Sequence, residues 1–179
     1  YSNDLQAIAG SDIYIVTVPT PVDEHNNPDL TAVRNASKMI GSVLQKGAIV
    51  VYESTVYPGV TEDIAGPELA AASGFECGQD FFLGYSPERI NPGDREHTVD
   101  RITKIVAGQT PKVTQILGEI YGKLTSGDVY LARDIKTAEA AKVIENAQRD
   151  INIAFINEVA TIFQKMGLSV YDVLEAAGT

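Results

Sequence analysis

Three side chains able to hold an anionic, oxygen-rich ligand recur at helical spacing late in the chain. Lys142, Asn146 and Arg149 stand at positions i, i+4 and i+7, so a helix places an ammonium, a carboxamide and a guanidinium on one face. The surrounding apolar pattern predicts this helix over residues 135–166. The same three residues could equally form a solvated surface, so the rest of the chain must decide whether they form a binding site.

Hydroxyl-bearing or charged side chains also follow three predicted strands. They are Thr20 after residues 12–18, Ser54 and Thr55 after residues 48–52, and Glu88 and Arg89 after residues 81–85. Ligands of parallel α/β sheets bind beyond the carboxyl ends of the strands, which favours a site there. Glu88 could act as a general base and Arg89 could grip a phosphate or carboxylate. The alternative is an ordinary solvated ion pair beside turn hydroxyls.

The composition of the chain argues against several classes of protein, among them nucleic-acid-binding, membrane-spanning and metal-binding proteins. The chain has 179 residues, of which 44% are hydrophobic, and its net charge of −10 makes a nucleic-acid-binding surface unexpected. Neither a membrane span nor a signal peptide is predicted. The single cysteine, Cys77, favours a cytoplasmic location, and the two histidines lie in no Cys/His cluster, so no metal site is expected. The flanking Glu76 and Asp80 should raise the pKa of Cys77 and make it a poor nucleophile.

Strands and helices alternate as far as Ala132, and the pattern beyond is helical. Further strands are predicted at 104–108 and 128–131, and further helices at 29–45, 61–72, 111–122 and 170–177, with Pro67 as a kink or break. Asp29, Thr61 and Ser169 are the expected helix caps. Alternation of this kind predicts a parallel α/β sheet over residues 1–132, followed by an all-helical region over 133–179.

A glycine-rich phosphate turn is absent from the sequence. A complete dinucleotide-binding domain opens with a strand and a Gly-x-Gly-x-x-Gly turn, and neither occurs here. Either the fold is of another kind, or the chain is a trimmed segment lacking the first half of such a domain. The opening Tyr1, in place of an initiator Met, fits the second interpretation.

Four motifs, taken together, resemble the UDP-glucose/GDP-mannose dehydrogenase family of nucleotide-sugar dehydrogenases. They are the segments Val18–Pro21, Glu53–Gly59, Ser86–Gly93 and Lys142–Arg149. The resemblance covers nearly the whole chain. The Ser-Pro-Glu-Arg-Ile-Asn-Pro-Gly motif is most similar to the branch acting on UDP-N-acetylhexosamines in surface polysaccharide biosynthesis. The resemblance to the family implies a partial Rossmann-like parallel sheet followed by a central helical region, which forms a homodimer through the long helix.

The resemblance also implies a reaction and three catalytic residues. Family enzymes oxidise the C6 alcohol of a UDP-sugar to a carboxylate with two NAD+, through a thioester on a cysteine. Lys142 would stabilise an oxyanion or transfer a proton, Asn146 would orient water or the C6 oxygen, and Glu88 would be the base in hydrolysis.

Binding residues are implied in the same way. Arg89, Ile90 and Arg149 would contact the UDP-sugar. Thr20 and Thr55 would line the NAD site.

Two departures from the family pattern predict that this chain alone is catalytically inactive. The glycine-rich turn is missing, and the chain reaches Thr179 before any segment resembling that of the nucleophilic cysteine; Cys77 does not match it. Two other interpretations remain open. One is an NAD(P) enzyme of the 6-phosphogluconate dehydrogenase type, and the other is a non-catalytic dimerisation module.

Overall fold

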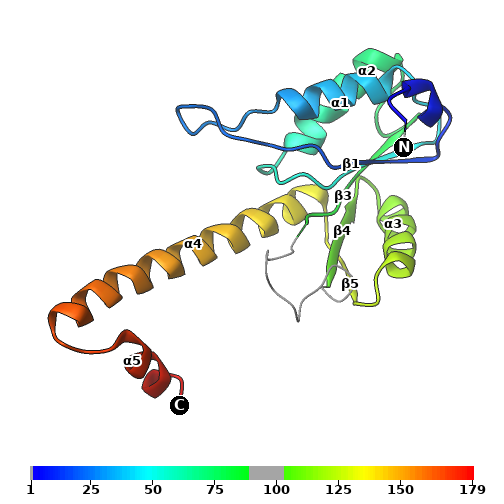
Figure 1. The fold of residues 1–179 in the computed structure, drawn as a ribbon. Helices are drawn as coiled ribbons and strands as arrows, with labels where there is room; N and C mark the ends of the chain where they lie inside the picture. Colours follow the sequence, from blue (N-terminus) through cyan, green and yellow to red (C-terminus); the bar gives the residue numbers. More distant parts are fainter. Residues whose placement is uncertain (1, 89–102) are drawn as a thin grey trace. The chain divides into compact units, whose positions relative to one another are not determined.

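Five short strands form one sheet in the part of the chain that the computed structural model describes, residues 2–88 and 103–179. The strands are β1 (Ile13–Val16), β2 (Ile49–Tyr52), β3 (Phe82–Tyr85), β4 (Lys104–Gly108) and β5 (Val129–Leu131), and they lie in that order (Figure 1). Each strand falls within or matches the range predicted from the sequence. The predicted α/β fold class is therefore confirmed.

The direction of β4 differs from the expected all-parallel arrangement. β1, β2 and β3 are mutually parallel, but β4 runs antiparallel to β3, with Tyr85 opposite Ala107, and β5 is parallel to β4. Alternating elements along a sequence do not reveal the direction in which a strand joins the sheet. As a result, the first residue of β4, Lys104, lies at the edge where β2 and β3 end.

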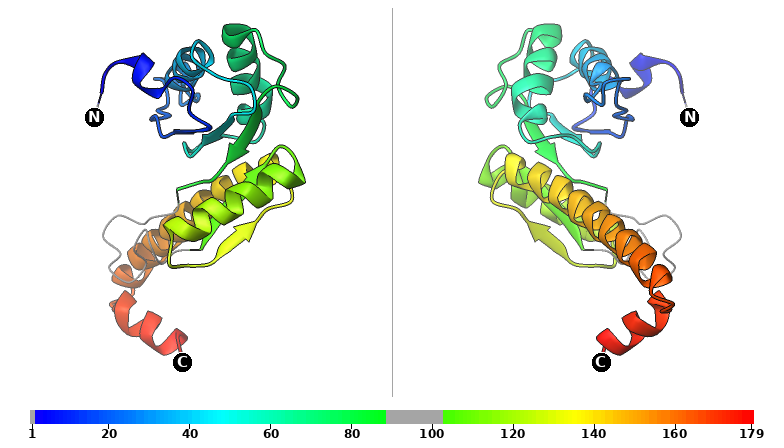
Figure 2. Two further views of the ribbon diagram at one scale, coloured as in Figure 1. Left: turned by 90° about the vertical axis from the view of Figure 1, so that its right-hand side faces the viewer. Right: turned by 90° about the vertical axis from the view of Figure 1, so that its left-hand side faces the viewer.

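Helices cover both faces of the sheet, because alternate strand residues point to opposite sides. On one face, Val50 and Leu83 belong to the core that also includes residues of α1 (Thr31–Gly41) and α2 (Gly66–Ser73). On the other face, Val51 packs in a second core with α3 (Pro111–Leu124), which lies along β4 and β5 (Figure 2).

Two glycines allow α3 to lie close to the sheet. A Cβ added at Gly84 would overlap the side chain of Leu117, and one added at Gly108 would come within 2.5 Å of the backbone nitrogen of Thr114. The small residues of β3 and β4 therefore set the distance between the sheet and α3.

Local signals in the sequence account for most helix boundaries. Ser169 caps α5 (Val170–Ala177), as expected. Asp29 accepts a hydrogen bond from the backbone nitrogen of Thr31 at 2.9 Å, but the N-cap residue of α1 is Leu30, one position later than predicted. The predicted helix 61–72 is interrupted, and the cap predicted at Thr61 was wrong, because the N-cap of the helical segment there is Gly59. A π-helical segment, η2 (Val60–Ala65), precedes α2, and Pro67 lies in the first turn of α2, where its missing N–H costs nothing.

Helix α4 (Ile135–Lys165) matches the long helix predicted from the sequence. The chain divides into two compact units within it, Tyr1–Val143 and Ile144–Thr179. No helix among the described residues is long and apolar enough to span a bilayer.

A buried carboxylate fixes the first turns of α4 within the first unit. Glu139 is fully buried and accepts hydrogen bonds from the backbone nitrogens of Gly59, at 2.5 Å, and Thr61, at 3.0 Å. These two N–H groups lie at the start of η2, Gly59 as its N-cap residue and Thr61 in its first turn. Glu139 therefore joins the helical segment that follows β2 to a helix that begins more than 70 residues later.

Replacing Glu139 with alanine should destabilise the chain by about 2–4 kcal/mol, because two buried N–H groups lose a charged acceptor. The measurement is the free energy of unfolding from urea denaturation of the 179-residue chain. Glu119→Ala, at an exposed position of α3, is the matched control and should change stability by less than about 0.5 kcal/mol. Equal effects of the two substitutions would contradict a structural role for the buried carboxylate.

Candidate functional site

Hydroxyl groups link the segments that follow β1 and β2. Thr20 Oγ1 donates to the carbonyl oxygen of Thr55 at 2.6 Å, and Ser54 Oγ donates to that of Val18 at 2.5 Å. The structure therefore brings together Thr20 and Thr55, the two residues that the resemblance assigns to an NAD site. Ser54 is buried, whereas Thr55 is exposed.

A cluster of charged and phenolic groups occupies the end of the sheet where β2 and β3 stop and β4 starts. The Lys104 ammonium lies 3.7 Å from the Glu53 carboxylate and 3.8 Å from that of Glu88. Tyr121 of α3 donates a hydrogen bond to Glu53, and Lys104 Nζ lies 5.6 Å from the centre of the Tyr121 ring. We call these four residues the strand-end cluster.

The strand-end cluster borders a small pocket of about 170 Å³, to which Leu124 and Thr125 also contribute. Burial, and then the hydrogen bond to the Glu53 carboxylate, raise the pKa of Tyr121, so its hydroxyl stays protonated at neutral pH. The phenol is therefore a fixed donor to Glu53. The arrangement places the Glu88 carboxylate beside the ammonium of Lys104, which is largely buried.

The predicted residues of α4 differ in their surroundings. Lys142 is buried, with 7% of its surface exposed, and belongs to the first unit. Asn146 is exposed, and the Arg149 guanidinium donates to Glu145 at 2.9 Å in the second unit. Burial of a lysine requires compensating contacts, which distinguishes Lys142 from a solvated surface residue.

Arg89 and Ile90, the other two predicted substrate contacts, lie outside the described residues.

Sequence reasoning missed Lys104, Tyr121 and Glu139. Lys104 is the first residue of a strand whose other residues are apolar. Its charge could therefore have predicted an acidic partner at the edge of the sheet. Tyr121 follows the apolar face of α3, and nothing in its spacing separates it from a core residue. Glu139 contacts residues 78 and 80 positions away, which no local pattern reveals.

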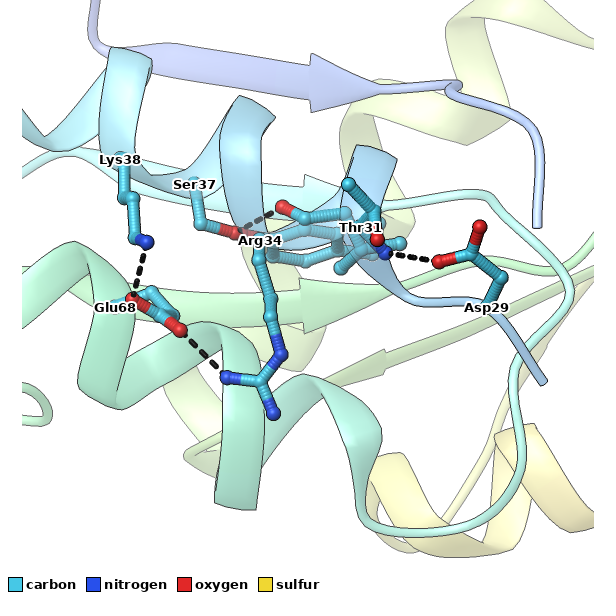
Figure 3. Close-up of polar contacts among 8 residues, drawn as sticks. Asp29, Thr31, Arg34, Ser37, Lys38 and Glu68 are labelled. Atoms are coloured by element: carbon cyan, nitrogen blue, oxygen red, sulfur yellow. Dashed lines mark hydrogen bonds and ion pairs between the residues drawn. The ribbon is translucent and has the colours of Figure 1, made fainter. Parts of the chain in front are cut away.

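A second, more open pocket of about 490 Å³ lies where the loop after β1 meets α1. Arg34 lines it, but its guanidinium lies 2.5 Å from Glu68 of α2, and Lys38 lies 3.7 Å from the same carboxyl group (Figure 3). The hydrogen bond from Arg34 lowers the pKa of Glu68. These cations therefore join α1 to α2.

Cys77 is half-buried, with its Sγ 3.7 Å from Gln109 Oε1. Its pKa is raised, as expected, but burial is the main cause and the nearby charge is that of Glu62. The expectation that Glu76 and Asp80 would act on the thiol was wrong.

Together, the mostly parallel sheet covered by helices, the hydroxyls at its carboxyl edge and the long helix that follows define a Rossmann-like α/β chain. The chain belongs to the UDP-glucose/GDP-mannose dehydrogenase family: residues 1–125 match its NAD binding domain and residues 136–179 its central domain. This membership decides against the 6-phosphogluconate dehydrogenase alternative.

Individual relatives are similar over the whole chain. It is 53% identical to a UDP-N-acetyl-D-glucosamine 6-dehydrogenase of Pseudomonas aeruginosa and 49% identical to one of Salmonella typhi, over all 179 residues and 42% of each relative. Among solved structures, a UDP-D-ManNAc dehydrogenase from Pyrococcus horikoshii has a TM-score of 0.91 at 32% identity, covering 99% of this chain and 42% of that one.

The raised pKa of Tyr121 predicts a pH effect at the alkaline end. A tyrosine whose pKa is higher in the folded than in the unfolded state contributes stability that is complete below about pH 10 and is lost as pH rises above it. Tyr121→Phe should therefore reduce the fall in unfolding free energy above about pH 10 by up to 1.4 kcal/mol per pH unit.

The measurement is urea denaturation at a series of pH values from 8 to about 12, a range that brackets tyrosine ionisation. Tyr171→Phe is the control, because Tyr171 is 81% exposed and should leave the slope unchanged. Identical slopes for the Tyr121 variant and the parent chain would contradict the argument.

Proposed function

We propose that this chain belongs to an NAD-dependent nucleotide-sugar 6-dehydrogenase that oxidises the C6 alcohol of a UDP-N-acetylhexosamine to a carboxylate for surface polysaccharide biosynthesis in the cytoplasm. The 53% identity to a UDP-N-acetyl-D-glucosamine 6-dehydrogenase, which extends over every residue of the chain, carries the proposal. Because the chain spans 42% of that relative, the activity is assigned to the complete gene product.

The residues at the carboxyl edge of the sheet fit one side of an NAD site. Thr20 and Thr55 are linked there by a hydrogen bond, and the buried Ser54 donates to the carbonyl oxygen of Val18. Such hydroxyls can donate to and accept from ribose and amide groups. Thr20 and Thr55 would hold NAD+, which would supply the hydride acceptor, while the chain's own residues would orient the substrate and move its protons.

Lys142 and Glu88 are the proposed proton-handling groups. A buried ammonium at Lys142 would donate to the C6 oxygen and stabilise negative charge developing on it. Glu88 would take a proton from the water that hydrolyses the thioester. Asn146 would orient that water or the C6 oxygen, and Arg149, with Arg89 and Ile90, would contact the UDP-sugar.

The proposed division into domains is 1–132 and 133–179, with the second forming a homodimer through the long helix. Support comes from an apolar stripe on the exposed part of α4, at spacings of seven and four residues, as in helix–helix seams. Its members Ile144, Ile151, Phe155 and Ile162 are 67%, 67%, 63% and 53% exposed. Burying such a stripe against a second copy would remove it from water.

Phe155→Glu should convert a dimer of the complete gene product into monomer, because a carboxylate would be buried in an apolar seam. Sedimentation equilibrium measures the outcome. Asn157→Glu is the control, since it lies roughly 200° around the helix from residue 155 and should leave the dimer intact. A dimer that survives Phe155→Glu would remove the long helix from the interface.

Lys142→Ala in the complete gene product should lower kcat by roughly 10²–10⁴-fold, the range expected for loss of acid–base or oxyanion chemistry. NADH formation with UDP-N-acetyl-D-glucosamine is the assay. Lys165→Ala, at an exposed position in the last turn of α4, should leave kcat unchanged. Absence of turnover by the unmodified protein with any UDP-N-acetylhexosamine would refute the proposed function, and an unchanged rate for Lys142→Ala would refute the role of that lysine.

A further inference from the structure

We infer that Lys104 is a positioning residue for Glu88, holding the carboxylate at the end of β3 through a chain of contacts that begins at Tyr121. The inference rests on the proposed function, because it concerns the group assigned there as general base. The family motifs imply no role for Lys104, Glu53 or Tyr121.

The ammonium of Lys104 is well placed for this role. Its side chain is 17% exposed, and its backbone nitrogen donates to the carbonyl oxygen of Asp128 at 2.9 Å, which fixes the start of β4 against β5. The Nζ atom lies almost equally far from Glu53 and Glu88, at 3.7 and 3.8 Å. One cation therefore bridges carboxylates that follow two neighbouring strands.

Glu53 is the fixed end of the bridge. Its side chain is 17% exposed, and it accepts a hydrogen bond from the hydroxyl of Tyr121, which is itself buried in the core between the sheet and α3. The Tyr121 ring also lies 5.6 Å from the ammonium, within the range of a cation–π contact. The cation is thus held by the ring and by Glu53.

Glu88 is the adjustable end. Its side chain is 46% exposed, against 17% for Glu53, so burial restrains it less. Two carboxylates that meet at one cation would repel each other without it. Removing the ammonium should therefore displace the Glu88 carboxylate outward, while Glu53 stays bound to Tyr121.

Three variants of the complete gene product test the inference by NADH formation with NAD+ and UDP-N-acetyl-D-glucosamine. Lys104→Met keeps the length of the side chain and should lower kcat on the order of 10- to 100-fold, as misplacement of a catalytic group by about 1 Å does, with KM for NAD+ within about twofold. Lys104→Arg should restore most of the rate, because the charge returns. Lys123→Met, at an exposed position of α3, should behave like the unmodified protein.

A loss of rate in Lys104→Met that arginine does not rescue, or that appears mainly as a higher KM for NAD+, would overturn the inference, because a general loss of structure would explain it. An unchanged rate would overturn it as well.

A crystal structure of the Lys104→Met variant provides a readout that needs no activity. A displacement of the Glu88 carboxylate by roughly 1 Å or more relative to Tyr121 Oη is expected, the scale at which catalytic geometry is lost. A carboxylate that stays in place overturns the inference. If the unmodified protein forms no NADH, the proposed function fails, and this measurement still decides whether Lys104 positions Glu88.

Discussion

The buried carboxylate of Glu139 is the interaction on which the arrangement of the first unit depends. A charged group can remain in a protein interior only if hydrogen bonds replace its hydration, and the N–H groups of Gly59 and Thr61 supply them. Since those donors lie at the start of η2, the carboxylate fixes the first turns of α4 to the element that follows the loop carrying Thr55. Lys142 follows three residues later in the same helix, so its position depends on this link.

The reversed direction of β4 has a comparable effect on the chemistry available at the sheet edge. In an all-parallel sheet, the residues that open a strand lie at the edge away from the carboxyl ends. Because β4 is antiparallel to β3, Lys104 instead meets Glu53 and Glu88, and α3 brings Tyr121 over the same edge. The strand-end cluster is therefore a product of topology as much as of the residues themselves.

Local patterns in the sequence predicted the elements well, and for identifiable reasons. The strand at Lys104–Gly108 and the cap at Ser169 rest on short-range chemistry that neighbouring residues determine. The direction of β4, the burial of Glu139 and the pairing of Lys104 depend on contacts between distant segments, and alternation or periodicity carries no information about them. Only part of the site could be predicted. The proximity of Thr20 and Thr55 followed from the order of the strands, whereas the spacing of Tyr121 is that of an ordinary core aromatic residue.

The backbone of Gly59 limits how this part of the molecule can evolve. Its φ of +102° is a conformation that side-chain-bearing residues rarely adopt, and a Cβ there would lie 2.7 Å from a carboxyl oxygen of Asp63. Single-codon changes at this position would therefore strain the turn whatever amino acid they introduced. Divergence among related proteins should be slow here even though the residue has no functional group, because its contribution is the direction in which its amide points.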